Sequence, residues 1–243
     1  AGGIVRNTSE DGIIAGNNVT IAGATVTQTG ATGVAGSGYT LLNSVIRGAR
    51  VGVQADSGAQ VLNNRVSETL LYGIEARFSG SSTLRGNVVA GGWSVGSAAP
   101  AATGEGIRIT GSNKLVEGNV VFGQVRTGIN VSSGSGTELR GNTVLHSERR
   151  YTADTPGETV GVSLGPVLSV GSSARDLTLR DNILVGDRTA VIGVSAGALG
   201  HVDSDYNLFW ALADRDEDGA GTIVTDAAGA FGSWGGRAIS GAG

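Results

Sequence analysis

Short runs of alternating apolar and polar residues recur along the chain, each bounded by Gly, Asn or Asp. One pattern spans six residues. They are an aliphatic residue, any residue, a Gly, Asn or Asp, a fourth residue that is usually Asn, any residue, and a second aliphatic residue. Its copies begin at residues 21, 41, 61, 84, 116, 139, 179 and 202. Alternation with a period of two indicates β-strands, and spacings of about 20–23 residues, with two longer ones, are typical of a solenoid.

A second pattern alternates with the first. It is a glycine followed by Ile or Val and then by strict alternation, at Gly12, Gly33, Gly52, Gly73, Gly106, Gly128 and Gly161. We expect the glycines and asparagines at corners, because such turns need a positive φ that β-branched residues resist. The sequence therefore predicts an all-β fold, a single-stranded right-handed parallel β-helix of about eight coils.

One asparagine occupies the same place in five copies of the first pattern. Because stacked coils lie ~4.8 Å apart, these side chains can hydrogen-bond from coil to coil. We predict an internal asparagine ladder, rather than a polar binding stripe, formed by Asn64, Asn87, Asn119, Asn142 and Asn182.

The repeat predicts a β-helix over residues 1–212 and a C-terminal tail over residues 213–243. We expect the tail to cover the end of the helix with Phe231 and Trp234, because an open solenoid end invites edge pairing. No comparable cap is visible at the N-terminus, which predicts an additional domain or subunit there.

Composition and charge narrow the classes of partner. Cysteine is absent, which excludes disulfides and thiol catalysis. The net charge of −4 gives no general attraction to nucleic acid, and Lys114 is the only lysine. No apolar run approaches the ~20 residues that span a bilayer.

The Gly–Ile/Val strands are predicted to carry two outward columns. Two residues after each glycine the column contains Ala35, Gln54, Glu75, Arg108, Asn130 and Ser163. Four residues after each glycine it contains Ser37, Asp56, Arg77, Thr110, Ser132 and Gly165. Long inserts at 91–104 and 147–158 are expected to wall a groove beside this face. Glu75 with Arg108, and Asp56 with Arg77, are predicted cross-strand ion pairs worth about 0.2–1 kcal/mol each.

A further outward column alternates loosely in charge, which predicts a solvated face. It contains Arg85, Glu117, Arg140, Arg180 and Asp203.

The repeats resemble those of the pectin lyase-like superfamily of parallel β-helices, and residues 205–210 resemble the segment that often closes such domains. The resemblance implies an extracellular or cell-surface, carbohydrate-active protein with a polysaccharide in its groove. It does not choose among lyases, epimerases, glycosidases and tailspikes, because a fold does not decide a function.

Lyase or epimerase chemistry removes a proton next to a carboxylate, so it needs a cation for the carboxylate and a group that transfers the proton. The candidate catalytic residues are Tyr151, His146, Arg108 and Glu75. The candidate substrate-binding residues are Arg77, Trp93, Asn130, Arg149 and Arg150.

Two enzyme motifs are incomplete. Residues 71–77 resemble the Tyr-Gly-aromatic-Asp-Pro-His motif of mannuronan epimerases in Tyr72 and Glu75, but Ala76 and Arg77 stand where Pro-His should be. A glycosidase would need two carboxylates, for which Asp56 and Glu75 are candidates, but the paired aspartates and the Gly-His-Gly of polygalacturonases are absent. A non-catalytic adhesin or tailspike-type module therefore stays an open alternative to an enzyme.

Metal binding is suggested at one place. Asp214, Asp216 and Asp218 match the start of a calcium loop, although Thr225 occupies its twelfth position, where a Glu is expected. Calcium is thus a candidate cofactor, with a solvated acidic turn as the alternative. His146 and His201 lie two coils apart and are expected to be separate surface residues.

Overall fold

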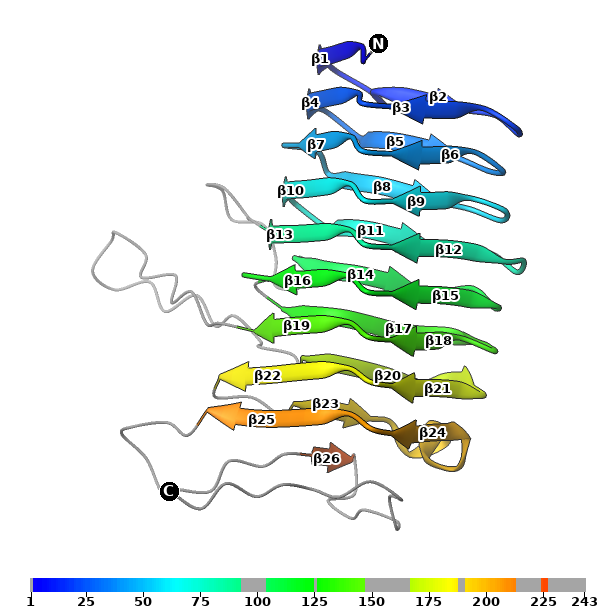
Figure 1. Ribbon diagram of the computed structural model, residues 1–243, viewed down its shortest axis with the longest axis vertical. Helices are drawn as coiled ribbons and strands as arrows, with labels where there is room; N and C mark the ends of the chain where they lie inside the picture. Colours follow the sequence, from blue (N-terminus) through cyan, green and yellow to red (C-terminus); the bar gives the residue numbers. More distant parts are fainter. Residues whose placement is uncertain are drawn as a thin grey trace.

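The computed structural model describes residues 2–92, 104–124, 126–146, 167–187, 191–212 and 224–226. Within them, three parallel sheets run the length of the molecule, and each coil adds one strand to each sheet (Figure 1). Strands that lie side by side therefore come from successive coils. The predicted parallel β-helix of about eight coils is confirmed.

Apart from Thr127–Ser135 and Leu168–Arg175, the described strands have three to five residues, because the corners follow each other closely along the chain. In the described residues, sheet A contains β1 (Ile4–Thr8), β4 (Thr25–Thr29), β7 (Val45–Arg47), β10 (Arg65–Thr69), β13 (Val88–Gly92), β16 (Val120–Phe122), β19 (Thr143–His146), β22 (Ile183–Asp187) and β25 (Leu208–Leu212). Sheet B contains β2 (Ile13–Ala15), β5 (Thr32–Gly36), β8 (Val51–Ala55), β11 (Tyr72–Ala76), β14 (Glu105–Ile109), β17 (Thr127–Ser135), β20 (Leu168–Arg175), β23 (Ile192–Val194) and β26 (Val224–Asp226). Sheet C contains β3 (Thr20–Ala22), β6 (Thr40–Leu42), β9 (Gln60–Leu62), β12 (Ser82–Arg85), β15 (Lys114–Glu117), β18 (Glu138–Arg140), β21 (Leu177–Arg180) and β24 (Val202–Asp205), and the 3-10 helix η1 (Ala196–His201) precedes β24.

The core is a stack of aliphatic side chains that point inward from all three sheets. In sheet B, Val53, Ile74 and Ile107 lie in register on β8, β11 and β14, and all three are fully buried. Like residues thus meet on successive coils, so the alternation of apolar and polar positions in each short strand places one face inside and the other outside.

The asparagine ladder forms as predicted, at the corner between sheets C and A. The backbone N–H of Asn87 and its Nδ2 both donate to Oδ1 of Asn119, at 2.9 and 3.0 Å. Asn119 makes the same two bonds to Asn142, and its own Nδ2 also donates to the carbonyl of Leu84 at 2.9 Å. Asn207 continues the ladder beyond Asn182.

The residue before each ladder position has a left-handed backbone, as predicted for this corner. Its φ lies between 49° and 64° at Gly23, Asn43, Asn63, Gly86, Gly118, Gly141, Asp181 and Tyr206. The expected positive φ is wrong, however, for the glycines that open the sheet B strands. Gly73 has no positive φ, and a Cβ there would meet a methyl group of Val89 and lie 2.6 Å from the carbonyl oxygen of Gly106. Close packing between coils, rather than a turn, requires this glycine.

The last copy of the first pattern lies two residues later than its aliphatic spacing suggests. Leu179 pairs with Ser204 and Arg180 with Asp205, so the copy begins at residue 204 and places Asn207 on the ladder. The sequence predicted that Asp203 belongs to the column of Arg85. This is wrong, because Asp203 pairs with Thr178. A polar residue at the aliphatic position conceals this register.

The first coil of the stack leaves apolar side chains exposed, whereas part of the predicted tail adds a strand at the other end. Ile4 and Ile14, on the first coil, are 73% and 79% exposed, and the partner predicted there stays a prediction. Within the predicted tail, residues 224–226 form β26 and pair with β23, which adds a strand to sheet B. Phe231 and Trp234 lie outside the described residues.

No helix in the described part of the chain is long and apolar enough to cross a membrane.

Replacing a central ladder residue tests the contribution of the ladder to stability. Asn119→Ala leaves the Asn87 N–H and the Leu84 carbonyl buried without their partner, so we expect the free energy of unfolding to fall by at least about 3 kcal/mol. Asn207→Ala is the control, because Asn207 is half-buried and water can replace its bonds. Equal losses in urea denaturation of the two variants would contradict the prediction.

The glycine column can be tested by adding a single methyl group. We expect Gly73→Ala to lower the free energy of unfolding by about 1–3 kcal/mol, because the methyl group must displace Val89 or the backbone of the next coil. The control is Gly16→Ala, where the added Cβ has nothing within 4 Å and φ is not positive. Thermal unfolding of both variants measures the difference, and a neutral Gly73→Ala would refute the packing explanation.

Candidate functional site

The outer face of sheet B gathers the polar side chains that the repeat predicts. Gln54, Glu75, Arg108 and Asn130 lie in register on β8, β11, β14 and β17. These strands are rigid because their inward residues are locked in the core, so the outward side chains have fixed neighbours one coil away. The predicted walls at 91–104 and 147–158 lie largely outside the described residues.

Asp56 and Arg77 form the predicted cross-strand ion pair. Nε of Arg77 lies 3.1 Å from Oδ1 of Asp56, and Nη2 lies 3.3 Å from Oδ2. Nε2 of Gln54 donates to Oδ2 at 3.2 Å. Both oxygens of the nearly buried Asp56 are thus engaged by the protein, so this carboxylate is poorly suited to the glycosidase role.

Glu105 is a fully buried carboxylate at the edge of the same face, and it was not among the predicted residues. Nη1 of Arg126 lies 3.2 Å from its Oε1, and Nδ2 of Asn130 donates to the same oxygen at 3.0 Å. Nη1 of Arg108 lies 3.5 Å from its other oxygen, Oε2, which accepts no hydrogen bond from the described residues. A buried charge needs such partners, because ionised groups out of water are costly when unpaired.

Arg108 contacts several other residues of this face. Its Nη1 donates to the phenol oxygen of Tyr72 at 3.0 Å, and its guanidinium lies 4.7 Å from the centre of the Tyr72 ring. Its Nε lies 3.8 Å from Oε1 of Glu75. One guanidinium therefore contacts two carboxylates and one aromatic ring, and its side chain stays 26% exposed.

The pKa values of Glu75 and Tyr72 are both raised. Partial burial raises the pKa of Glu75, and the nearby Arg77 and Arg108 offset the shift only in part. Partial burial also raises the pKa of Tyr72, against the opposing effect of Arg108. The pKa of Glu75 is thus shifted towards neutral pH, whereas the phenol of Tyr72 keeps its proton at neutral pH.

We give the name sheet B charge cluster to six charged residues at this face: Asp56, Glu75, Arg77, Glu105, Arg108 and Arg126. Three predicted site residues, Glu75, Arg77 and Arg108, belong to it, and Asn130 contacts it through Glu105. Tyr72 and Glu105 occupy paired positions just before the strand glycines. That position could have been compared between coils as a third column, which would have revealed both residues.

The other predicted site residues are not brought to this face by the described structure. The backbone of His146 ends β19, in sheet A, and nothing is described of its side chain. Outside the described residues lie Trp93, Arg149, Arg150, Tyr151, Asp214, Asp216 and Asp218. Among the described residues, no three His, Asp or Glu side chains gather as a metal site would need.

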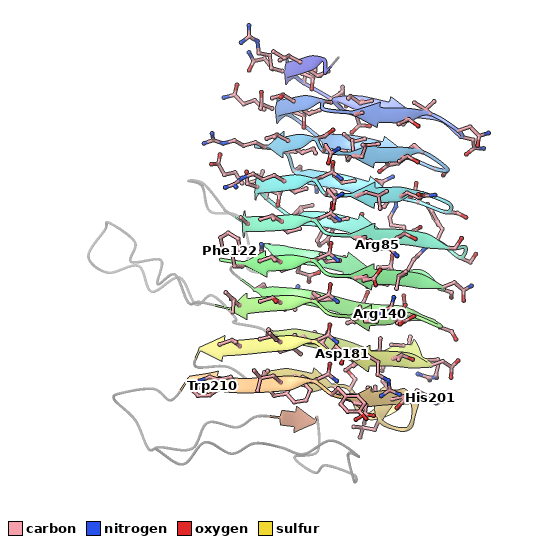
Figure 2. The ribbon with its side chains drawn as sticks, viewed as in Figure 1. Arg85, Phe122, Arg140, Asp181, His201 and Trp210 are labelled. Carbon is pink, nitrogen blue, oxygen red and sulfur yellow. The ribbon has the colours of Figure 1, made fainter. Side chains whose placement is uncertain are left out.

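The other two faces have a different character (Figure 2). On sheet C, Glu117 lies between Arg85 and Arg140, at 2.5 and 2.6 Å, as expected for a solvated charged face. On sheet A, the side chains of Phe122 and Trp210 are exposed.

His201 lies at the surface, as the sequence predicted. It ends η1 and lines a cavity of about 320 Å³ together with Asp176 and Asp203. Its Nδ1 lies 4.0 Å from Oδ1 of Asp176, and its side chain is 44% exposed.

Comparison with protein families agrees with the fold. The model described as "right handed beta helix region" matches residues 2–144 and 34–228, so the chain belongs to this family. A comparison with curated proteins gave no match.

Solved structures show the same fold at low sequence identity. The chain resembles the periplasmic alginate epimerase AlgG with a TM-score of 0.58 and 13% identity, over 86% of this chain and 51% of the other. It resembles pectate lyase Pel9A with a TM-score of 0.62 and 9% identity, over 96% and 70%. For the alginate lyase from Paenibacillus sp. str. FPU-7 the values are 0.56 and 12%, over 93% and 91%. The chain spans about half the length of the epimerase.

Glu105 provides a test of how the charge cluster is held. We expect Glu105→Gln to lower the free energy of unfolding by about 1–3 kcal/mol, because Arg126 and Arg108 lose a fully buried counter-charge. Glu138→Gln is the control, since the Glu138 side chain is 41% exposed and pairs with Arg140 at 3.5 Å, and we expect its effect to stay within about 0.5 kcal/mol. Denaturant melts measure both, and equal effects would contradict the prediction.

Proposed function

We propose that the outer face of sheet B binds an acidic polysaccharide and transfers a proton at one of its uronate sugars. The observation that supports this most directly is the contact between Arg108 and Glu75. A partly exposed guanidinium lies next to a half-buried carboxyl whose pKa is raised, and the phenol oxygen of Tyr72 accepts a hydrogen bond from that guanidinium. A cation for the sugar carboxylate and a proton acceptor are the two groups that this chemistry requires.

In the proposed reaction the sugar carboxylate lies against Arg108. Ionised Glu75 accepts the proton from the carbon next to that carboxylate, and the electron pair of the broken C–H bond passes into the carboxylate system. In β-elimination that pair then forms a carbon–carbon double bond while the bond to the leaving sugar oxygen breaks, and the oxygen takes a proton. In epimerisation a proton instead returns to the same carbon from the opposite face.

Tyr72 is the described residue best suited to donate a proton, because its raised pKa keeps the phenol protonated. Tyr151 and His146 stay predicted alternatives for proton transfer. An extracellular or cell-surface location belongs to the same proposal, which is supported by the fold shared with structures described as an alginate epimerase, a pectate lyase and an alginate lyase.

The charges of the cluster give the proposal a pH dependence. Three arginines face three carboxylates, so the cluster is neutral when all six residues are ionised. Protonation of Glu75 leaves one net positive charge. Because the pKa of Glu75 is raised, this occurs at a higher pH than for an ordinary carboxyl, and an anionic polymer should then bind more tightly.

A non-catalytic display module is the second candidate. One observation favours it: Asp56 with Arg77, and Glu105 with Arg126, neutralise one another within the face. Cross-strand pairs of this kind also serve only to stabilise a sheet.

Two substitutions at the cluster test the proposed function. We expect Arg108→Lys to weaken binding of alginate or polygalacturonate about tenfold, through loss of a bidentate carboxylate contact. We expect Glu75→Gln to abolish turnover and to bind at pH 7 as tightly as the wild-type protein binds at acid pH, because Gln is uncharged like protonated Glu. Affinity electrophoresis measures binding, and absorbance of new unsaturated sugar ends or NMR of the epimer ratio measures turnover.

The matched control is Arg140→Lys on sheet C, which pairs with Glu117 and should change neither property. For Glu75 the folded-state pKa is raised, so its contribution to stability is present at low pH and is lost as pH rises through that value. Glu75→Gln should therefore melt no lower than the wild-type protein at pH 7. Binding without turnover on every acidic polymer would favour the display module, and no binding at all would refute the proposal.

A further inference from the structure

Phe78 is an aromatic residue in an unfavourable backbone conformation. It lies in the corner between β11 and β12 with a φ of 56°, and it is 59% exposed. A bulky L-residue resists the left-handed region, which usually takes Gly, Asn or Asp, and an exposed ring gains little from burial. Neither the local backbone nor the core therefore accounts for a phenylalanine at this position.

The strained corner is longer than its neighbours. Six residues, 77–82, separate Ala76 from Thr83, whereas four separate the paired Ala55 and Gln60 one coil earlier.

Buried contacts hold this corner from below. The ammonium group of Lys114, the only lysine, donates to the carbonyl oxygens of Arg77 and Gly80 at 3.1 and 2.6 Å and to Oγ of Ser82 at 3.2 Å. A Cβ on Gly111, in the next coil, would meet the carbonyl group of Phe78, so the two backbones are in close contact. Strain of this kind persists where the surroundings fix it, and such positions cluster at binding sites.

The ring of Phe78 is also oriented by the charge cluster. The guanidinium carbon of Arg77 lies 4.7 Å from the centre of the ring, and Asp56 holds that guanidinium through two contacts. One side of the ring is therefore covered by a fixed cation, and much of the rest faces solvent.

We propose that Phe78 is a sugar-stacking subsite at the edge of the outer face of sheet B. A pyranose ring would pack its apolar C–H face on the exposed surface of Phe78, whose π-electron face is negative. This inference rests on the proposed function and extends it, because it assigns a second sugar position beside the one at Arg108.

The position of Phe78 defines the length of ligand that can use it. Phe78 lies three residues after Glu75 and beyond the end of β11, so their Cα atoms are at most roughly 10 Å apart. The proposal places one sugar at Arg108 and a second on Phe78, so the subsite would act on a polymer or oligomer and contribute nothing to a single uronic acid bound at Arg108.

Tyr206 provides an internal control for the substitution. It too is aromatic, has a φ of 55° and is 79% exposed, but it lies in the corner between sheets C and A. It shares the strain and exposure of Phe78 without the neighbouring charge cluster.

The experiment measures the affinity of four full-length variants for alginate and polygalacturonate, together with their thermal midpoints. We expect Phe78→Ala to weaken binding about five- to tenfold and Phe78→Tyr to retain wild-type binding, because stacking needs an aromatic face. Phe78→Gly should bind as weakly as Phe78→Ala yet melt at or above the wild-type temperature, because glycine accepts a positive φ. Tyr206→Ala should leave binding unchanged.

The outcomes separate the two proposals. Normal binding by Phe78→Ala and Phe78→Gly, alongside weak binding by Arg108→Lys, would overturn the stacking subsite and leave the proposed function intact. Weak binding by Phe78→Tyr equal to that of Phe78→Ala would also overturn it, since an aromatic ring would then not be what matters. Absence of polymer binding by the wild-type protein would overturn both.

Discussion

Hydrogen bonding between coils is the constraint on which the other features of this protein depend. Each coil is too thin to bury its own apolar residues, so it is stable only when its neighbours cover it. The asparagine ladder joins the coils at one corner through buried bonds such as that from the backbone N–H of Asn87 to Oδ1 of Asn119, at 2.9 Å. A slip of one residue would break these bonds and turn the aliphatic core outward, so the register is strongly determined.

That register also positions the side chains of the candidate site. Because Glu75 and Arg108 occupy paired positions on β11 and β14, residues 33 positions apart in the sequence become neighbours. The side chains cannot drift apart, since each strand is held from inside by buried residues such as Ile74 and Ile107. A repeat whose main role is to stack thereby offers a fixed polar face on which a few substitutions can build a binding site.

The candidate site combines two features that cost stability. Among the described residues, one oxygen of the fully buried Glu105 has no hydrogen-bond partner, and Phe78 adopts a backbone conformation that usually takes Gly, Asn or Asp. Features of each kind also occur elsewhere in the described chain, as at Thr137 and Tyr206. At this face the two lie on neighbouring coils, beside the sheet B charge cluster.

The sequence by itself determined the sheet-forming strands, the corners and the five-residue asparagine ladder, because each depends on local alternation or on a residue type repeated at a fixed position. It also identified the columns that contain Glu75, Arg77 and Arg108, since stacking follows from the repeat. The register predicted from the sequence was wrong where a polar residue replaces the expected aliphatic one, as at Ser204. Only the tertiary structure decided that Glu105 is buried against Arg126 and that Arg77 covers the ring of Phe78. Those contacts depend on side-chain direction and corner length, which no periodicity in the sequence encodes.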